Sequence, residues 1–148
     1  MSDRIRRCAP LRAALLVLAL LVSTAGTARA DDALYRDLGG QSGVSAVVEA
    51  FLFRLADDTR INHHFAETNV VRFRDKLVEL LCQLAGGPCR YSGDSMKLTH
   101  AGMGIDHADF NAVVENLIEA MSGLGVATGV QNRLLARLAP LHADIIER

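Results

Sequence analysis

The sequence lacks the patterns that identify many enzymes from sequence alone. Its 148 residues contain no internal repeat, no low-complexity stretch and no strand-like alternation of useful length. They also contain no phosphate-binding loop, no serine nucleophile elbow and no paired carboxylates at a recognisable spacing. Composition and motifs therefore assign the chain to no enzyme class.

Long hydrophobic runs are also missing, apart from one near the N-terminus. The run Ala13 to Val22 follows four arginines, and the small residues after it end in Ala28-Arg29-Ala30. A basic start, a short apolar centre and an A-x-A end are typical of a secretory signal. The run is about half the roughly 20 residues that a membrane-spanning helix needs. We expect residues 1–30 to be a signal peptide cleaved after Ala30, and the protein to be exported, periplasmic or secreted.

The remaining domain, residues 31–148, has little positive charge. It carries 11 basic and 16 acidic residues, a net charge of −5, and no basic stripe. Such a surface binds neither nucleic acid nor anionic lipid well. The length suits one domain with one core. We expect no nucleic-acid partner, no membrane partner after cleavage, and a monomer or weak dimer.

Cysteine is scarce, and only Cys82 and Cys89 lie outside the expected signal. In a cytosolic protein the pair would suggest free thiols or a metal, but in an exported one it predicts a disulfide. The turn Gly86-Gly87-Pro88 lets the two approach each other. Neither has a second Cys or His at C-x-x-C spacing, which argues against zinc, and the C-x-x-C-H signature of covalent haem attachment is absent.

Apolar residues recur with helical spacing in four segments. One stripe on a helix repeats at steps of three and four residues. The stripes span residues 44–55, 70–84, 110–121 and 134–146. A short helix over residues 33–38 precedes these four. The segment between the second and third stripes can form one further helical turn, near residues 94–100. A plain four-helix bundle with short loops does not need such an irregular segment.

Capping residues mark where these helices begin. We expect Thr68 or Asn69 to cap the second long helix and Asp106 to cap the third. The T-x-x-Q spacing from Thr128 to Gln131 predicts a capping box for the fourth. Pro140 should bend or interrupt that last helix, because proline donates no backbone hydrogen bond.

Five histidines are present, and none forms a metal cluster at helical spacing. His63 and His64 are adjacent, so on a helix they point about 100° apart. His107 and His142 stand alone. We interpret these four as solvated or structural histidines.

His100 differs in its context. Met96 precedes it by four residues on the same helical face, and small residues follow it directly, in Ala101-Gly102-Met103-Gly104-Ile105. A lone histidine beside apolar helix faces suits a haem iron. A buried structural histidine has the same surroundings, so the residues alone leave both interpretations open.

An ordered set of short motifs resembles the group I truncated haemoglobins. The motifs are Leu34-Tyr35, Leu38-Gly39-Gly40, Phe65 with Thr68-Asn69, Gly86-Gly87-Pro88, Tyr91-Ser92-Gly93, Met96-Lys97 and His100-Ala101-Gly102-Met103-Gly104-Ile105. Each is weak alone, but their order and spacing are specific, and they span the chain from Leu34 to about Ile146. The resemblance implies an all-α fold, a two-over-two sandwich of four helices around a b-type haem.

The resemblance also implies the site residues. His100 matches the proximal ligand of the iron. Lys76 matches a basic position that in relatives reaches towards a haem propionate. The other matched pocket residues are Phe65, Leu80, Leu81, Tyr91, Met96 and Met103.

The distal side departs from the family pattern. Where many relatives place a tyrosine and a glutamine that hydrogen-bond the bound gas, this chain has Leu52 and Leu77, with Phe73 on the same face. None of the three can donate a hydrogen bond. We expect weaker O₂ binding, with CO and NO less affected. An alternative is internal ligation, in which His63, His64 or Lys76 takes the sixth position.

We consider three functional interpretations of the chain. The first, which we favour, is reversible binding of a diatomic gas at ferrous haem b, with haem-based electron transfer as a variant. The second is NO dioxygenation or a peroxidase-like reaction, although the matched pocket positions lack an acid or base. The third is a four-helix module without a cofactor. The first two need a reductase or other electron donor that no motif identifies.

Overall fold

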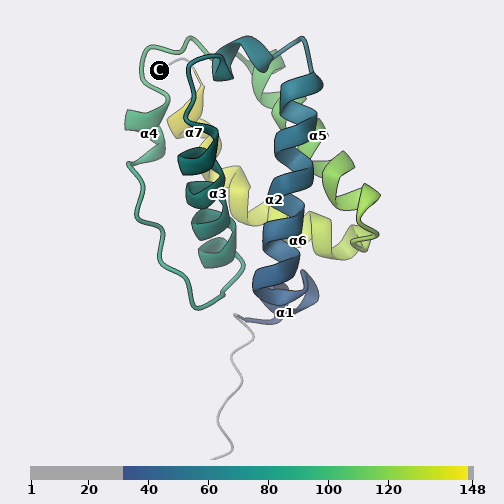
Figure 1. Ribbon diagram of the computed structural model, residues 1–148. Coiled ribbons are helices and arrows are strands. Elements are labelled where there is room, and N and C mark those ends of the chain that lie inside the picture. The colour runs from purple at the N-terminus through teal and green to yellow at the C-terminus, as the bar shows by residue number, and fades with distance from the viewer. Residues whose placement is uncertain (1–31, 147–148) are drawn as a thin grey trace, which may run out of the picture.

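The structure is a computed structural model that describes residues 32–146 (Figure 1). The expected signal peptide, residues 1–30, lies outside the described residues. Those residues contain helices and no strand. The elements are α1 (Ala33–Asp37), α2 (Gly40–Asp57), η1 (Asn62–Phe65), α3 (Val70–Leu84), α4 (Met96–Thr99), α5 (His107–Gly123), α6 (Thr128–Leu138), η2 (Ala139–Leu141) and α7 (His142–Ile145). The all-α prediction is confirmed.

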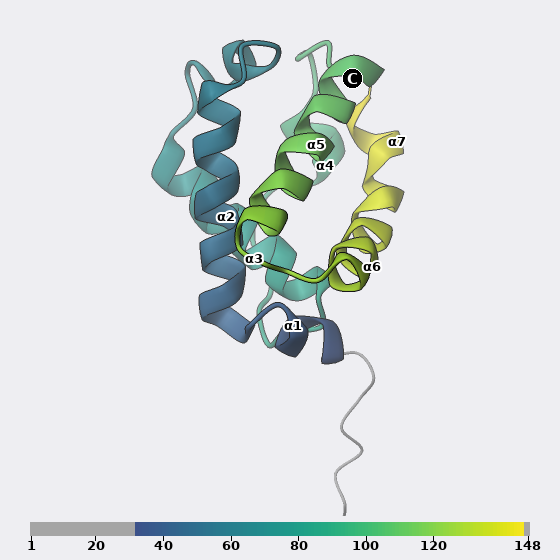
Figure 2. The same ribbon diagram turned by 90° about the vertical axis from the view of Figure 1, so that its right-hand side faces the viewer.

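Two pairs of long helices build the molecule. Helix α2 contacts α3 and α5, and α6 in turn contacts α3 and α5. Figure 2 shows α2 on one side and α6 on the other, with α5 between them and α3 crossing behind. The predicted stripes supply the core between them, because each helix turns its apolar face inward. The most buried members include Val48, Phe51, Leu55, Leu81, Leu117, Met121 and Leu134.

The helix starts were predicted correctly at two of three places. Asn69, not Thr68, caps α3 by accepting a hydrogen bond from the backbone N–H of Arg72 (3.0 Å). Asp106 caps α5 in a full capping box with Asp109.

The capping box predicted for α6 is wrong. Ala127 is the N-cap, and Thr128 is already helical. The Gln131 side chain is only 6% exposed, and its amide donates to the carbonyl oxygen of Val126 (2.8 Å) and to the hydroxyl of Ser122 (3.2 Å). These hydrogen bonds link Gln131 in α6 to the end of α5 and to the turn that follows it. The Gln131 side chain is therefore not available to cap α6.

Pro140 interrupts the last helical segment, as predicted. Helix α6 ends at Leu138, the short η2 follows, and α7 begins at His142. Because Pro140 donates no backbone hydrogen bond, the chain tightens into a 3₁₀ turn there. Among residues 32–146, no helix combines the length and apolarity needed to cross a membrane.

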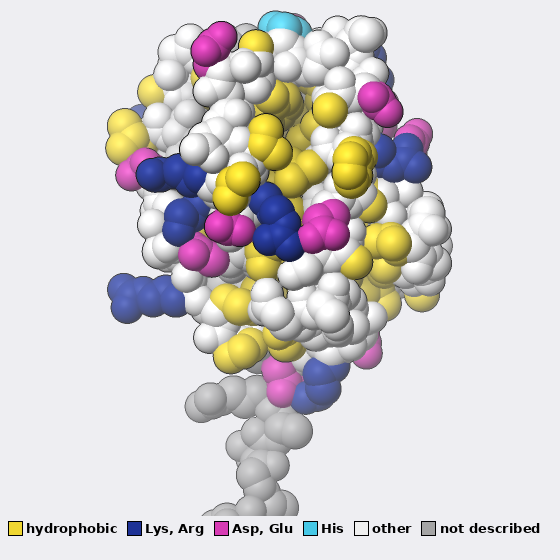
Figure 3. Space-filling view, viewed as in Figure 1, with side chains coloured by type: hydrophobic (Ala, Val, Ile, Leu, Met, Phe, Trp, Pro, Cys, Tyr) yellow, Lys and Arg dark blue, Asp and Glu magenta, His cyan; other side chains and the backbone are white. Residues whose placement is uncertain are grey.

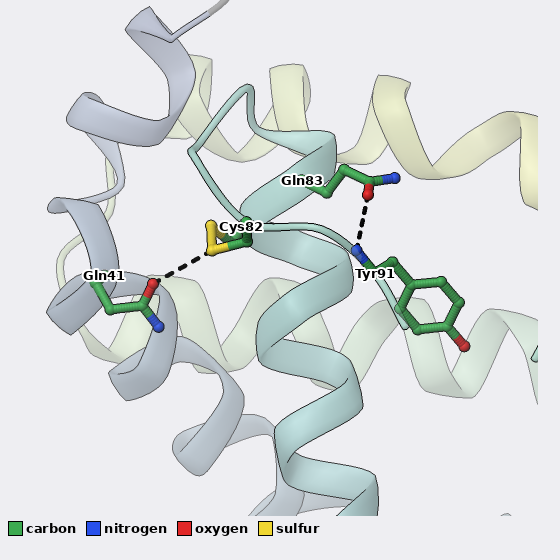
Figure 4. The surroundings of a disulfide bond; sticks show 5 residues. Gln41, Cys82, Gln83 and Tyr91 are labelled. Carbon is green, nitrogen blue, oxygen red and sulfur yellow. Dashed lines mark hydrogen bonds between the residues drawn. A yellow bond between two sulfur atoms is a disulfide. The ribbon is translucent and has the colours of Figure 1, made fainter. Parts of the chain in front are cut away.

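The segment after α3 is fastened back onto that helix. A disulfide joins Cys82 to Cys89, as the sequence predicts (Figure 4). Their Cα atoms are 5.7 Å apart. The turn between them needs a glycine at position 87, where an added Cβ would lie 2.6 Å from the Tyr35 ring. Two residues beyond the disulfide, the Tyr91 backbone N–H donates to Oε1 of Gln83 (2.7 Å). The start of the loop that leads to α4 is therefore fixed.

Candidate functional site

A cavity of about 580 Å³ lies inside the fold, lined by residues from α2, α3, α4, α5, α6 and α7. Its wall is mainly apolar, with a few polar groups. A volume of a few hundred Å³ with apolar walls is typical of a cofactor or ligand site.

His100 lies on the wall of this cavity, at the end of α4. Ser95 starts that helix by accepting a hydrogen bond from the Leu98 backbone N–H (3.3 Å). The Nδ1 atom of His100 lies 2.8 Å from the carbonyl oxygen of Met96. A carbonyl oxygen only accepts hydrogen bonds, so Nδ1 carries the proton and Nε2 keeps a free lone pair. This is the tautomer and orientation of a histidine prepared to ligate a metal.

The structure brings most of the predicted pocket residues to the same cavity. Nine of the ten line it together with His100. They are Phe65, Phe73, Lys76, Leu77, Leu80, Leu81, Tyr91, Met96 and Met103.

Leu52 is the exception. It lines a second cavity of about 440 Å³, which shares Leu55, Phe65, Thr68 and Phe73 with the first. On α2, Phe51 and Leu55 face the first cavity, and Leu52 is turned by about 100° from Phe51. Figure 3 shows a hollow with hydrophobic side chains over the space between α2 and α3.

The other half of the wall was missed by sequence reasoning. It comes from α5, α6, η2 and α7, and its members include Phe110, Val113, Leu117, Leu135, Leu138, Leu141 and Ile145. Several of these residues belong to the predicted stripes. Their helical period was visible in the sequence, but nothing there showed which stripe residues would leave a space rather than close the core.

Lys76 lines the cavity, but its charge is already paired. Its Nζ lies 3.0 Å from each carboxylate oxygen of Glu79 and donates to the Ser92 hydroxyl (2.5 Å). Hydrogen bonds from the backbone N–H and the hydroxyl of Ser92 are the main reason that the pKa of Glu79 lies below its usual value. The hydrogen bond from Lys76 makes a smaller contribution in the same direction.

A second polar pair on the wall was also missed. His64 Nε2 lies 3.2 Å from Oδ2 of Asp109, and the two side chains are only 13% and 21% exposed. A carboxylate only accepts, so Nε2–H is the donor. The hydrogen bond from the backbone N–H of Asp106 is the main reason that the pKa of Asp109 lies below its usual value. The hydrogen bond from His64 lowers this pKa further. His64 and Asp109 are 45 residues apart, so no local pattern pairs them.

No group of three or more His, Cys, Asp or Glu residues within residues 32–146 could hold a bare metal ion. A single imidazole on the wall of a large apolar cavity instead suits a metal that brings its other ligands in a macrocycle. With the helical sandwich around it, this site defines the class of protein as a globin.

Comparison with known proteins gives the family. The family described as bacterial-like globin matches residues 33–147, and the chain belongs to it. The group 1 truncated hemoglobin GlbN of Mycolicibacterium paratuberculosis is 34% identical over 112 residues, covering 76% of this chain and 82% of that protein. The group 1 truncated hemoglobin of Tetrahymena pyriformis is 33% identical over 113 residues, covering 76% and 93%.

Solved structures agree with this assignment. The truncated hemoglobin of Tetrahymena pyriformis in its Fe(III) form has a TM-score of 0.75 at 30% identity, over 78% of this chain and 98% of that one. The 2/2 hemoglobin of Synechococcus, in the cyanomet state with covalently attached heme, has a TM-score of 0.72 at 26% identity, with the same coverage. The chain is thus a group I truncated globin with the two-over-two fold.

Haem b is the cofactor of this family, and the residues here fit it. The cavity is large and mainly apolar, one imidazole has a free Nε2, and cationic side chains lie on the wall for the propionates. No C-x-x-C-H signature is present for covalent attachment.

Proposed function

We propose that this chain binds haem b through Nε2 of His100 and reversibly binds a diatomic gas at the iron. The observation that carries the proposal is the 2.8 Å hydrogen bond from Nδ1 of His100 to the Met96 carbonyl, on the wall of an apolar cavity. That bond fixes the tautomer and orients the ring, so Nε2 is the nitrogen available to the iron.

The surrounding residues supply a dry, shaped pocket. The rings of Phe65 and Phe73 are stacked with centroids 5.4 Å apart, which stiffens the wall on the α3 side. When bound, the haem supplies an iron centre with one coordination position for a gas. The apolar wall keeps water away from that position.

The distal wall favours ligands that need no hydrogen bond. Leu77 and Phe73 line the cavity and cannot donate, and Leu52 lies in the second cavity. A hydrogen bond to a charged acceptor contributes roughly 1.5–3 kcal/mol. We therefore propose that O₂ binds about 10- to 150-fold more weakly than in a pocket with such a donor, with CO less affected.

Absorption spectra test the haem proposal. Wild type, His100→Ala and the control His107→Ala are expressed with haem available, and their ferric, ferrous and CO-bound spectra are recorded. His107 does not line the cavity. We expect a Soret band and a CO shift in wild type and His107→Ala, and a lost or altered band in His100→Ala that added imidazole restores. A colourless wild type, or an unchanged spectrum in His100→Ala, would refute the proposal.

The His64–Asp109 pair favours a second candidate, peroxide turnover at the same haem. A histidine whose Nε2 is held by a carboxylate is a general acid/base candidate, which the matched family positions lack. Peroxide consumption with an electron donor tests it. His64→Gln should lower the rate, whereas His107→Gln, which changes a histidine that does not line the cavity, should not. Equal rates in all three proteins would leave gas binding as the function.

We also propose that the chain is exported after cleavage behind Ala30. The basic, apolar and A-x-A pattern of residues 1–30 supports this, and the disulfide is of the kind that persists in oxidising compartments. N-terminal sequencing of the exported protein should start at Asp31. A cytosolic protein that retains Met1 would contradict the proposal.

A further inference from the structure

Four basic side chains line the cavity, and three of them are engaged. His64 is bonded to Asp109, Lys76 to Glu79 and Ser92, and His100 to the Met96 carbonyl. The fourth is Arg72, which is exposed at the rim. Within residues 32–146, its guanidinium has no hydrogen-bond or ion-pair partner, since only its backbone N–H is bonded, to Asn69.

The position of Arg72 is unfavourable for the fold. It is the third residue of α3, in a first turn that holds no acidic residue. The N-terminus of a helix carries partial positive charge, so a cation there costs stability unless an anion is nearby. Arg74, two residues on, shows the contrast, because it is paired with Glu49 and Asp75. An unpaired cation at a helix N-terminus, on a cavity rim, indicates an anionic ligand.

The cofactor of the proposed function carries such anions, since haem b has two propionate carboxylates. Arg72 and Lys76 are one helical turn apart on α3, and both line the cavity. The charge of Lys76 is already neutralised by Glu79 at 3.0 Å. The carboxylates of Asp94 and Asp109 also line the cavity and would repel a propionate placed beside them.

We propose that Arg72 binds a haem propionate and is the main electrostatic anchor of the cofactor's polar edge. This inference depends on the proposed haem binding. The planar guanidinium can donate two parallel hydrogen bonds to a carboxylate, and the N-terminus of α3 adds its positive potential. Lys76, the position that the family resemblance implies for this role, contributes less because Glu79 and Ser92 hold its ammonium group.

The rate of haem loss to an excess of a haem-scavenging apoprotein tests the proposal. The proteins are wild type, Arg72→Gln, Arg72→Lys, Lys76→Gln and the control Arg74→Gln, which changes a paired arginine off the cavity. We expect Arg72→Gln to lose haem about 3- to 10-fold faster. Arg72→Lys should lose haem at an intermediate rate. Lys76→Gln and Arg74→Gln should lose it at rates within about twofold of wild type.

Haem dimethyl ester, which lacks the free carboxylates, separates this contact from a general loosening. With the ester, wild type and Arg72→Gln should lose the cofactor at the same rate. The haem-free Arg72→Gln protein should also be at least as stable to urea as wild type, because a cation has left the helix N-terminus. Faster loss is therefore not a sign of misfolding.

Each other outcome overturns a defined claim. Equal haem loss from wild type and Arg72→Gln refutes the Arg72 anchor while leaving haem binding intact. A difference that persists with the dimethyl ester shows that Arg72 acts on the pocket and not on a propionate. If Lys76→Gln speeds haem loss more than Arg72→Gln does, Lys76 and not Arg72 is the main propionate anchor. A wild type that takes up no haem refutes the proposed function and this inference together.

Discussion

At the scale of single residues, the cavity wall carries His100, the proposed iron ligand, among mainly apolar side chains. His100 is held in one tautomer by a backbone carbonyl, so its orientation depends on the geometry of α4 and not on another side chain. Leu77 and Phe73 offer contact area but no hydrogen bond. On the proposed function, affinity for the cofactor and selectivity among gases therefore depend on different residues.

Leu77→Gln should slow O₂ release by about tenfold, because it places an amide donor on the cavity wall. Leu52→Tyr should change O₂ release less, since Leu52 lines the second cavity behind Phe65 and Phe73. Flash photolysis and stopped-flow mixing measure both rates. A large effect of Leu52→Tyr with none from Leu77→Gln would mean that Leu52 faces the gas.

Asp58 is the residue whose titration should matter most for stability. Hydrogen bonds from Arg60, and then from the buried Asn116 at 2.6 Å, hold its pKa far below the usual value. A carboxylate with a lowered folded-state pKa stabilises the fold above its unfolded pKa, near 4, and this stabilisation is lost as the pH falls towards the folded value.

We therefore expect Asp58→Asn to lower the free energy of unfolding at pH 7, with a difference from wild type that shrinks below about pH 4. Urea unfolding at pH 7, 4 and 3 measures it. Asp57→Asn, a change at an exposed neighbour, is the control. A difference that stays constant from pH 7 to pH 3 would show that the Asp58 charge is not responsible.

At the scale of elements, α3 holds the loop that leads to His100. Cys89 is bonded to Cys82, Tyr91 to Gln83, and the backbone N–H of Ser92 to Glu79 at 2.9 Å. All three attachments are to residues in the C-terminal half of α3. The same helix lines the cavity, so it shapes the pocket and also positions the segment that carries His100.

Reduction of the disulfide should lower the free energy of unfolding by about 2 kcal/mol on the chain-entropy model. It should also speed haem loss, because the loop before α4 loosens. Urea unfolding and haem transfer with and without reductant measure both effects. Cys89→Ser should match reduced wild type and be insensitive to reductant. Unchanged haem loss after reduction would mean that the other attachments suffice.

At the scale of the whole molecule, the two helix pairs enclose a space that the protein does not fill. A cavity of about 580 Å³ leaves the lining side chains without packing partners on one side. The core around Val48, Met121 and Leu134 is, in contrast, closed. The fold is therefore built around a cofactor.

Haem removal should lower the melting temperature by about 10 to 25 °C, because a ligand that binds only the folded state stabilises it by mass action. Hydrogen exchange should rise most in α4, a one-turn helix that contacts α7 and lines the cavity. Calorimetry and exchange mass spectrometry of the haem-bound and haem-free proteins measure this. Equal protection in both forms would show that the cavity does not depend on its ligand.

Much of this architecture was predictable because it depends on local patterns. Helical stripes, the caps Asn69 and Asp106, the break at Pro140 and the turn between Cys82 and Cys89 all involve residues close in sequence. The ordered motifs ending in His100 were enough to indicate the family. The capping box at Thr128 failed because its partner Gln131 is used by a contact with the preceding turn.

The sequence by itself determined the helices, the family and the candidate ligand, since each follows from spacing along one segment. Only the tertiary structure decided which side of α2 Leu52 occupies and that Asp109 meets His64. It also decided that, among the described residues, the Arg72 guanidinium has no partner while the Lys76 ammonium has one. Those facts depend on how helices pack across separations of tens of residues. Burial and pairing at such distances are properties of the folded chain and leave no periodic trace in the sequence.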